Sequence, residues 1–148
     1  MPQPILRPAE SSEIELAFDI KRDAMGPHVA AKWGWNEVFQ REHHFRRWRE
    51  KPWHFIVVEG QVAGTVSLDW QSTHLQFGEF YVASPFRGQG IGTVVLAGAL
   101  IEADARALET KLEYLKWNPV ASLYARHGFK VVEQSETHFL AVRPPGAA

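Results

Sequence analysis

The sequence predicts an α/β fold in which helices flank a mixed, mostly antiparallel sheet. Two strand-like runs, 55–58 and 62–68, are joined by a tight turn and predict a hairpin. A nearly apolar helical pattern over 94–108 lies between further strand-like runs and predicts one parallel crossover. The length of 148 residues, with 45% apolar and 22% charged residues, fits a single globular domain over 1–148, of which we expect 144–148 to fray.

Helical patterns occupy most of the chain before the hairpin. An N-cap at Ser11-Ser12 begins a helix that is expected to break at Gly26-Pro27. A second helix starts near Asn36 and ends before Pro52. A short strand at 5–7 precedes both helices.

The remaining elements alternate between strands and helices. After the hairpin we expect a strand, the apolar helix, another strand, a short helix that stops at Gly128, and two closing strands. The expected ranges are 75–82, 94–108, 112–115, 119–127, 131–132 and 139–142.

Composition and charge exclude several kinds of chemistry. The absence of cysteine removes a disulfide framework, a cysteine nucleophile and any zinc site that uses thiolates. A net charge of -1 argues against electrostatic capture of nucleic acid or of an anionic membrane. The histidines lack the spacing of a metal motif, and we expect the pair His43-His44 at the surface. For this reason we expect no metal site. The sequence shows no leader-like or membrane-spanning pattern, so the protein is expected in the cytoplasm.

Residues 82–93 carry a glycine-rich turn between a strand and the apolar helix. Gly88, Gly90 and Gly92 remove side chains where the chain bends, so that successive N–H groups can converge on an anion at the positive end of the helix. No Gly-Lys-Ser/Thr follows, and the spacing differs from that of a dinucleotide fingerprint. The turn is therefore either a phosphate seat or a connection that only needs left-handed residues.

A second motif follows the next strand. Residues 87–92 read Arg-Gly-Gln-Gly-Ile-Gly, and the later segment 118–129 contains Asn118, Ala121, Leu123, Tyr124, Gly128 and Phe129. Together the two segments resemble the GCN5-related N-acetyltransferase (GNAT) family, in which the glycine turn holds the pyrophosphate of acetyl-coenzyme A. The resemblance spans residues 53–142.

This resemblance implies a GNAT-like fold whose sheet is splayed between the fourth and fifth strands, at 77–82 and 112–117. The pantetheine arm would pair with the backbone around Val82, whose N–H would also meet the oxyanion. For Asn118 the alternative role is that of a turn residue at a strand end. The residues expected to bind the cofactor are Tyr81, Val82, Arg87, Gly88, Gln89, Gly90, Ile91, Gly92, Thr93, Asn118 and Tyr124.

Two residues are candidates for the proton transfers. Acyl transfer from a thioester to an amine needs a neutral nucleophile and a proton for the departing thiolate. Glu79, on the strand beside the splay, is the candidate base, and its alternative is a solvated strand residue. Tyr124 matches the tyrosine of the family and is the candidate acid, and its alternative is a side chain that only packs.

The segment between the first two helices is the expected acceptor entrance, by analogy with the family. Trp33 and Trp35 either line the substrate site with Glu79, where their rings could hold a cationic amine, or are simply core residues. The basic segment 40–51 is either a phosphate or nucleic-acid patch or a solvated helix face, and its interspersed glutamates favour the second interpretation.

These features predict an enzyme, an acetyl-CoA-dependent N-acetyltransferase that acts on the primary amine of a small molecule or on an exposed protein amine. The absence of cysteine supports direct transfer without an acyl-enzyme, by exclusion. The alternative is a non-catalytic acyl-CoA-binding module of the same fold. The expected partner is the amine acceptor, with neither nucleic acid nor membrane, and the apolar final strands resemble those that pair in dimers of this family, so a homodimer is a further expectation.

Overall fold

The computed structural model describes residues 3–116, 118 and 120–146, and for His28, Lys32 and Trp33 it describes the backbone alone. Two compact units divide the chain, the first made of Met1–Ser67 with Glu79–Ile91 and the second of Leu68–Gly78 with Gly92–Ala148. The single domain over 1–148 stays a prediction. Over the described part of the chain, every helix is too short or too polar to cross a membrane.

Within the described residues, seven strands form one mixed sheet in the order β1-β2-β3-β4-β5-β7-β6. The expected alternation of helices and strands is confirmed, including the short first strand. The strands are β1 (Ile5–Pro8), β2 (Trp53–Val58), β3 (Gln61–Trp70), β4 (His74–Val82), β5 (Glu109–Leu115), β6 (Lys130–Gln134) and β7 (His138–Arg143).

The parallel pair β4 and β5 confirms the predicted fold class. The described pairing joins His74–Gln76 to Glu109–Lys111. Both strands continue beyond this ladder, β4 to Val82 and β5 to Leu115. The opening expected between the fourth and fifth strands stays a prediction, and Trp117, the last residue expected in the fifth strand, lies outside the described residues.

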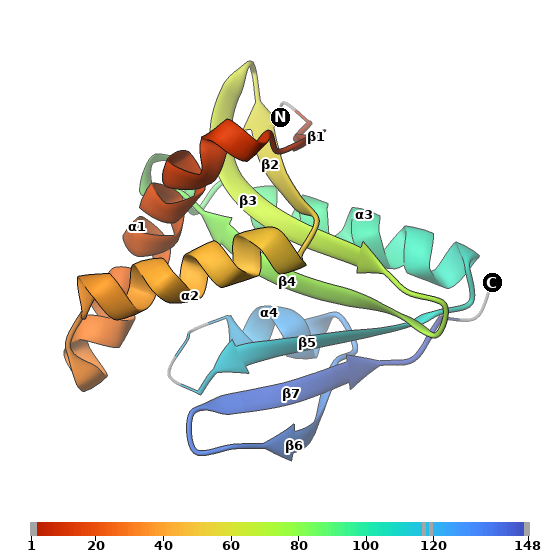
Figure 1. Ribbon diagram of the computed structural model, residues 1–148. Helices are drawn as coiled ribbons and strands as arrows, with labels where there is room; N and C mark the ends of the chain where they lie inside the picture. The colour runs from red at the N-terminus through yellow and green to blue at the C-terminus, as the bar shows by residue number, and fades with distance from the viewer. Residues whose placement is uncertain (1–2, 117, 119, 147–148) are drawn as a thin grey trace. The chain divides into compact units, whose positions relative to one another are not determined.

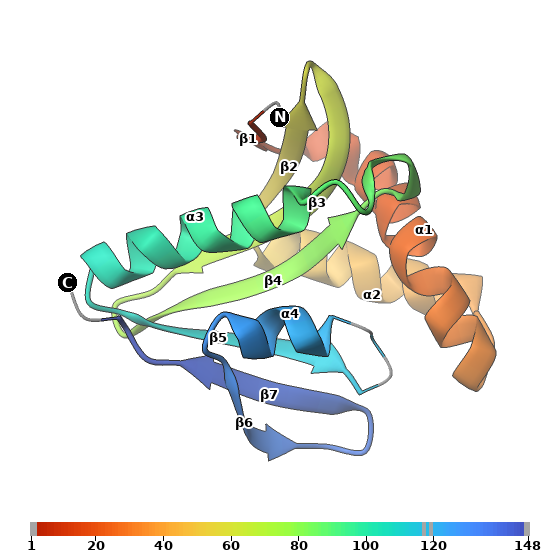
Figure 2. The same ribbon diagram turned by 180° about the vertical axis from the view of Figure 1, so that it is seen from behind.

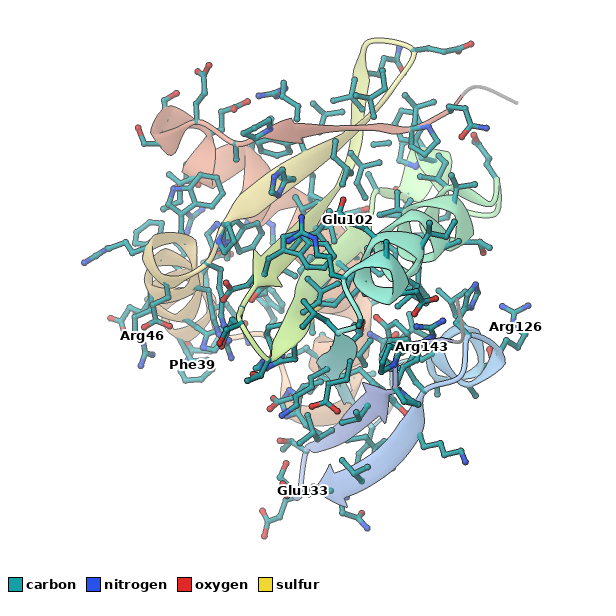
Figure 3. All side chains as sticks on the ribbon, turned by 90° about the vertical axis from the view of Figure 1, so that its right-hand side faces the viewer. Phe39, Arg46, Glu102, Arg126, Glu133 and Arg143 are labelled. Carbon is teal, nitrogen blue, oxygen red and sulfur yellow. The ribbon has the colours of Figure 1, made fainter. Side chains whose placement is uncertain are left out.

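In the first unit, the helices α1 (Ile14–Trp33) and α2 (Glu37–Glu50) lie on the same face of the β2–β3 hairpin (Figure 1). A one-turn 3-10 helix, η1 (Ser11–Glu13), precedes α1. Packing of α1 against β2 buries Ala17 and Ile20 together with Trp53 and Phe55. On the outer side of α2, Phe39 and Arg46 are exposed (Figure 3).

The expected helix break at Gly26-Pro27 is wrong, because α1 continues through Pro27 to Trp33. Proline has no N–H, so the carbonyl of Asp23, four residues earlier, loses its helical donor. The Nη2 of Arg87 donates to that carbonyl instead, at 3.1 Å. A partner distant in the sequence therefore compensates for the missing bond.

The expected surface position of the His43-His44 pair is wrong for His44, which is fully buried. Its Nε2 lies 2.9 Å from the carbonyl oxygen of Ile14. Its ring packs against Phe18 and Trp53, with centroids 5.3 Å away in each case. The α2 sequence is mostly polar, so the aromatic cluster around this histidine provides much of the contact between α2 and the core.

The second unit holds α3 (Ile91–Ala105), α4 (Ala121–Arg126) and the antiparallel strands β5, β7 and β6; Figure 2 shows α4 beside β5. The helix α3 lies three residues earlier than the predicted 94–108. It ends there because Ala107 adopts a left-handed φ of 56° and the N–H of Leu108 donates to the carbonyl of Ala103. Pro119, the expected first residue of the short helix, lies outside the described residues.

The C-terminal residues 144–146 are exposed, but they are tied to α3 through Asp104. The carboxylate of Asp104 accepts two hydrogen bonds from Arg143, at 2.8 and 3.0 Å. It also accepts one from the N–H of Gly146 at 2.7 Å. Figure 3 shows Arg143 at the side of the molecule that carries α4.

Candidate active site

The glycine turn follows β4 through a short 3-10 segment, Ser84–Phe86, and leads directly into α3 at Ile91. Gly88 and Gly90 have φ values of 76° and 78°, which an L side chain rarely adopts. The residues 88–90 are exposed, and a Cβ placed on Gly88 would meet no heavy atom within 4 Å. The turn is therefore exposed and free of bulky side chains at the start of a helix, which is the kind of position where backbone N–H groups can bind a phosphate.

The side chains of Arg87 and Gln89 are hydrogen-bonded to neighbouring groups of the protein itself. Arg87 donates from Nε to the Val82 carbonyl at 2.9 Å and from Nη2 to the Asp23 carboxylate at 3.0 Å. Gln89 donates to the carbonyl of Pro85 at 3.1 Å. The same Asp23 carboxylate accepts from the N–H of Ser84 at 2.8 Å. These side chains hold the turn in place through contacts with the protein itself.

The other residues predicted to bind the cofactor occupy the start of α3 and the approach to α4. Ile91 is buried, whereas Gly92 is half-buried and Thr93 is exposed in the first turn of α3. The Oδ1 of Asn118 accepts a hydrogen bond from the N–H of Val120 at 3.1 Å. This bond is typical of a turn residue, the alternative role of Asn118, and its binding of the cofactor stays a prediction.

Glu79 lies within β4 in an irregular backbone conformation, with a φ of 45°. Positive φ is strained for a residue other than glycine, and such strain is found at functional sites. The buried Thr65 stabilises this conformation, because its hydroxyl donates to the Glu79 carbonyl at 2.8 Å. On the adjacent strand Gly64 allows the backbone of Tyr81 to approach closely, since a Cβ there would overlap the Tyr81 carbonyl oxygen.

The Glu79 carboxylate lies among cations rather than in solvent. Its side chain is only 10% exposed, and its Oε2 lies 3.7 Å from Nζ of Lys21. The other oxygen lies 4.0 Å from Nε of Arg47. The hydroxyl of Tyr81, a residue predicted on the cofactor side, donates to Oε2 at 3.2 Å. The alternative of a solvated strand residue is therefore wrong for Glu79.

Burial shifts two titratable groups around Glu79. Desolvation lowers the pKa of Lys21, and the charge of Glu79 opposes that shift. Burial, followed by the charges of Lys21 and Arg47, lowers the pKa of His43 to about 4. His43 is therefore neutral at pH 7.

The pKa of His43 predicts acid-dependent stability. In the unfolded chain His43 binds a proton below about pH 6.5, whereas in the folded protein it binds one only near pH 4. The free energy of unfolding therefore falls as the pH falls through this window. We expect His43→Gln to lose less stability than the wild type between pH 7 and pH 4.5, by on the order of 1 kcal/mol. Urea unfolding at the two pH values measures this difference, and equal losses in both proteins would contradict it.

Tyr124 is buried in α4 against other rings. Its ring centroid lies 5.3 Å from that of Tyr114 and 5.7 Å from that of Phe129. Burial raises the pKa of the phenol, so the hydroxyl keeps its proton at every pH that an assay would use. Within the part of the chain that the structure describes, no hydrogen bond of this hydroxyl is seen, and its role as the acid stays a prediction.

The predicted acceptor residues are described only in part. Trp35 is half-buried, and its Nε1 donates to Glu37 at 3.3 Å. Its ring centroid lies 6.4 Å from that of buried Phe18, so this tryptophan packs at the edge of the core. The side chain of Trp33 lies outside the described residues.

Sequence reasoning missed Lys21 and Arg47. A signal for Lys21 was present, because it follows the buried Ala17 and Phe18 at helical spacing, on the apolar face of α1. Elsewhere on the basic helix α2, Arg41 forms ion pairs with Glu15 at 2.7 Å and Glu37 at 3.4 Å. The basic segment is thus partly neutralised by carboxylates of its own fold.

The family of the chain follows from a sequence match. Residues 51–131, more than half of the chain, match the family model described as an acetyltransferase (GNAT) domain. The chain therefore belongs to the GNAT acetyltransferase family, and the predicted resemblance is confirmed. No curated protein sequence matches the chain at a significant level.

Solved structures share the fold over nearly the whole chain. PH1933 from Pyrococcus horikoshii has a TM-score of 0.75 at 18% identity and covers 98% of this chain and 100% of its own. The PaiA N-acetyltransferase from Thermoplasma acidophilum, in complex with coenzyme A, has a TM-score of 0.74 at 16% identity, covering 96% and 99%. The ribosomal-protein-S18-alanine N-acetyltransferase from Escherichia coli has a TM-score of 0.71 at 15% identity, covering 99% and 96%. At these identities the likeness shows a common fold.

Proposed function

We propose that this protein is an acetyl-CoA-dependent N-acetyltransferase that transfers the acetyl group directly to a primary amine. The observation that carries the proposal is the exposed turn at Gly88–Gly90, whose two left-handed glycines open backbone N–H groups at the start of α3. Membership of the GNAT family and the coenzyme A complex of the PaiA enzyme support it. The acceptor is a small molecule or an exposed protein amine.

On the donor side, the residues present fit a diphosphate. The backbone N–H groups around Gly88, Gly90 and Gly92 would hold it, while Arg87 and Asp23 keep the turn in shape. Acetyl-CoA supplies the activated acyl group as a thioester. The backbone N–H of Val82 would stabilise the negative charge that develops on the acyl oxygen.

On the acceptor side, a proton must leave the amine. An alkylamine with a pKa near 10.4 is neutral about once in several thousand molecules at pH 7, a deficit of roughly 4–5 kcal/mol. We assign its removal to Glu79, directly or through a water molecule, because its side chain is only 10% exposed and belongs to β4, the strand that leads into the glycine turn. Tyr124 would then protonate the departing thiolate.

Thiol release with a panel of amines tests the proposal. Amine-dependent release of free thiol from acetyl-CoA, with the N-acetylated product seen by mass spectrometry, would support it. Binding of acetyl-CoA without release to any amine would instead favour the acyl-CoA-binding module. Calorimetry that detects no binding at millimolar acetyl-CoA would reject both functions.

The base assignment predicts a specific change in Glu79→Gln. The carboxylate must be ionised to accept a proton, so the wild-type rate should fall on the acidic side of its pH profile. We expect kcat/KM to drop about 100-fold in the variant and the acidic limb to disappear. Glu50→Gln, an exposed position at the end of α2, is the matched control and should keep both rate and profile. An acidic limb that persists in Glu79→Gln would assign the proton transfer to another group.

A further inference from the structure

Within the described residues, the charged groups in contact with the Glu79 carboxylate are two cations. Lys21 and Arg47 both lie within 4.0 Å of its carboxylate, and His43 beside them is neutral at pH 7. One of these two positive charges balances the negative charge of Glu79, and the second is in excess. The excess is unusual for an enzyme whose acceptor arrives as a cationic amine, because like charges repel.

The two cations differ in how they are placed. The side chain of Lys21 is only 6% exposed and lies 3.7 Å from Glu79, so this pair satisfies itself in the interior. The side chain of Arg47 is 39% exposed, and its approach to Glu79, at 4.0 Å, is longer than a hydrogen bond. Within the described residues, the Arg47 guanidinium makes no side-chain hydrogen bond. It is the excess cation, and it is accessible.

A guanidinium that is accessible, and that makes no side-chain hydrogen bond within the described residues, has a chemical consequence for the acceptor. Its planar set of N–H donors matches a carboxylate, which it can bind with two parallel hydrogen bonds. A carboxylate on Arg47 would cancel the repulsion that a bare ammonium group meets there. It would also place an amine on a neighbouring carbon close to Glu79.

We infer that the acceptor is a small amino acid with a free carboxylate next to its amine, and that Arg47 binds this carboxylate. This inference rests on the proposed function, since it names the acceptor of the same site. Arg47 is a specificity-determining residue, because it selects amines that carry an anionic group over plain amines and polyamines.

Matched pairs of amines test the preference. Free amino acids and their amides differ in one charged group, so glycine with glycinamide and alanine with alaninamide isolate the carboxylate. We expect kcat/KM to favour the acid at least tenfold over the amide. Arg47→Gln should remove this preference by raising KM for the acid 10-fold to 100-fold, with kcat changed much less. Arg47→Lys should restore only part of it, because a lysine gives a single point charge.

The control uses the neighbouring arginine on the same helix. Arg46 is exposed on the outer side of α2 (Figure 3), so Arg46→Gln removes an equal charge outside the cluster around Glu79. The acid-over-amide preference should persist in this variant. A preference lost equally in both variants would trace it to overall charge and would overturn the assignment to Arg47.

Product binding gives a second readout that needs no turnover. N-acetylglycine and N-acetylalanine keep the carboxylate and lack the ammonium group, so both should bind the wild-type protein by calorimetry and bind Arg47→Gln at least tenfold more weakly. Acetylation that favours polyamines and is indifferent to Arg47→Gln would overturn the inference and leave the proposed function intact. Failure to acetylate any amine would reject the proposed function, and product binding would still decide whether Arg47 recognises a carboxylate.

Discussion

Replacement of Tyr124 by phenylalanine is expected to lower kcat about 100-fold while the protein stays folded. The change removes one hydroxyl and keeps the buried ring that contacts Tyr114 and Phe129. General-acid catalysis contributes on the order of 10²–10⁴ in rate, so a loss of this size is expected if the phenol protonates the thiolate. Stopped-flow or steady-state release of thiol measures the rate, and urea unfolding checks that stability is kept.

The neighbouring tyrosine provides a matched control for this variant. Tyr114 is also buried, and its ring lies 5.3 Å from that of Tyr124. Tyr114→Phe makes the same chemical change one ring away and should retain most of the wild-type kcat. A rate in Tyr124→Phe within threefold of the wild type would remove Tyr124 as the acid and leave it a packing residue.

The raised pKa of Tyr124 also limits what the pH profile can show. Burial disfavours the phenolate, so the hydroxyl keeps its proton above pH 10, where a free tyrosine loses it. Any loss of activity between pH 8 and 10 must therefore come from another group. The alkaline side of the profile should have the same midpoint in Tyr124→Phe, measured on its residual rate.

The order of the elements was predictable because each carries a local signal. The Asn36 cap, the hairpin turn and the glycines around α3 all act within a few residues of their own position. Pro27 and His44 misled the prediction for the opposite reason. The carbonyl that Pro27 leaves without a donor is satisfied by Arg87, and the burial of His44 depends on Trp53. Neither partner is visible from local sequence.

The candidate site divides in the same way. The glycine turn, Glu79 and Tyr124 were predicted from motif and strand position, and the structure adds the environment of each. Lys21 and Arg47 become part of the site only because α1 and α2 place them beside Glu79 in β4. Contacts between side chains of different helices leave no local spacing in the sequence. Arg47 was therefore interpreted as part of a solvated helix face.

Replacement of Gly64 by alanine is expected to destabilise the protein by about 3 kcal/mol or more. Gly64 is buried in β3, and an added methyl group would overlap the carbonyl oxygen of Tyr81 and lie 3.2 Å from the Val82 Cα. Both neighbours are backbone atoms, so no rotamer change relieves the contact and the strand itself must shift. Urea unfolding measures the loss, and thermal unfolding should show a decrease of roughly 6–12 °C in Tm.

Gly98 in α3 separates this effect from the general cost of replacing a glycine. It is exposed, and a Cβ there would meet nothing within 4 Å, so Gly98→Ala should stabilise the protein by about 0.5–1 kcal/mol through helix propensity. The molecules of Gly64→Ala that do fold should also show a raised KM for acetyl-CoA. Tyr81 and Val82 belong to the segment that Gly64 lets approach, and Val82 is the residue whose N–H we assign to the acyl oxygen. Unchanged stability together with an unchanged KM would contradict the close approach of the Tyr81 backbone to Gly64.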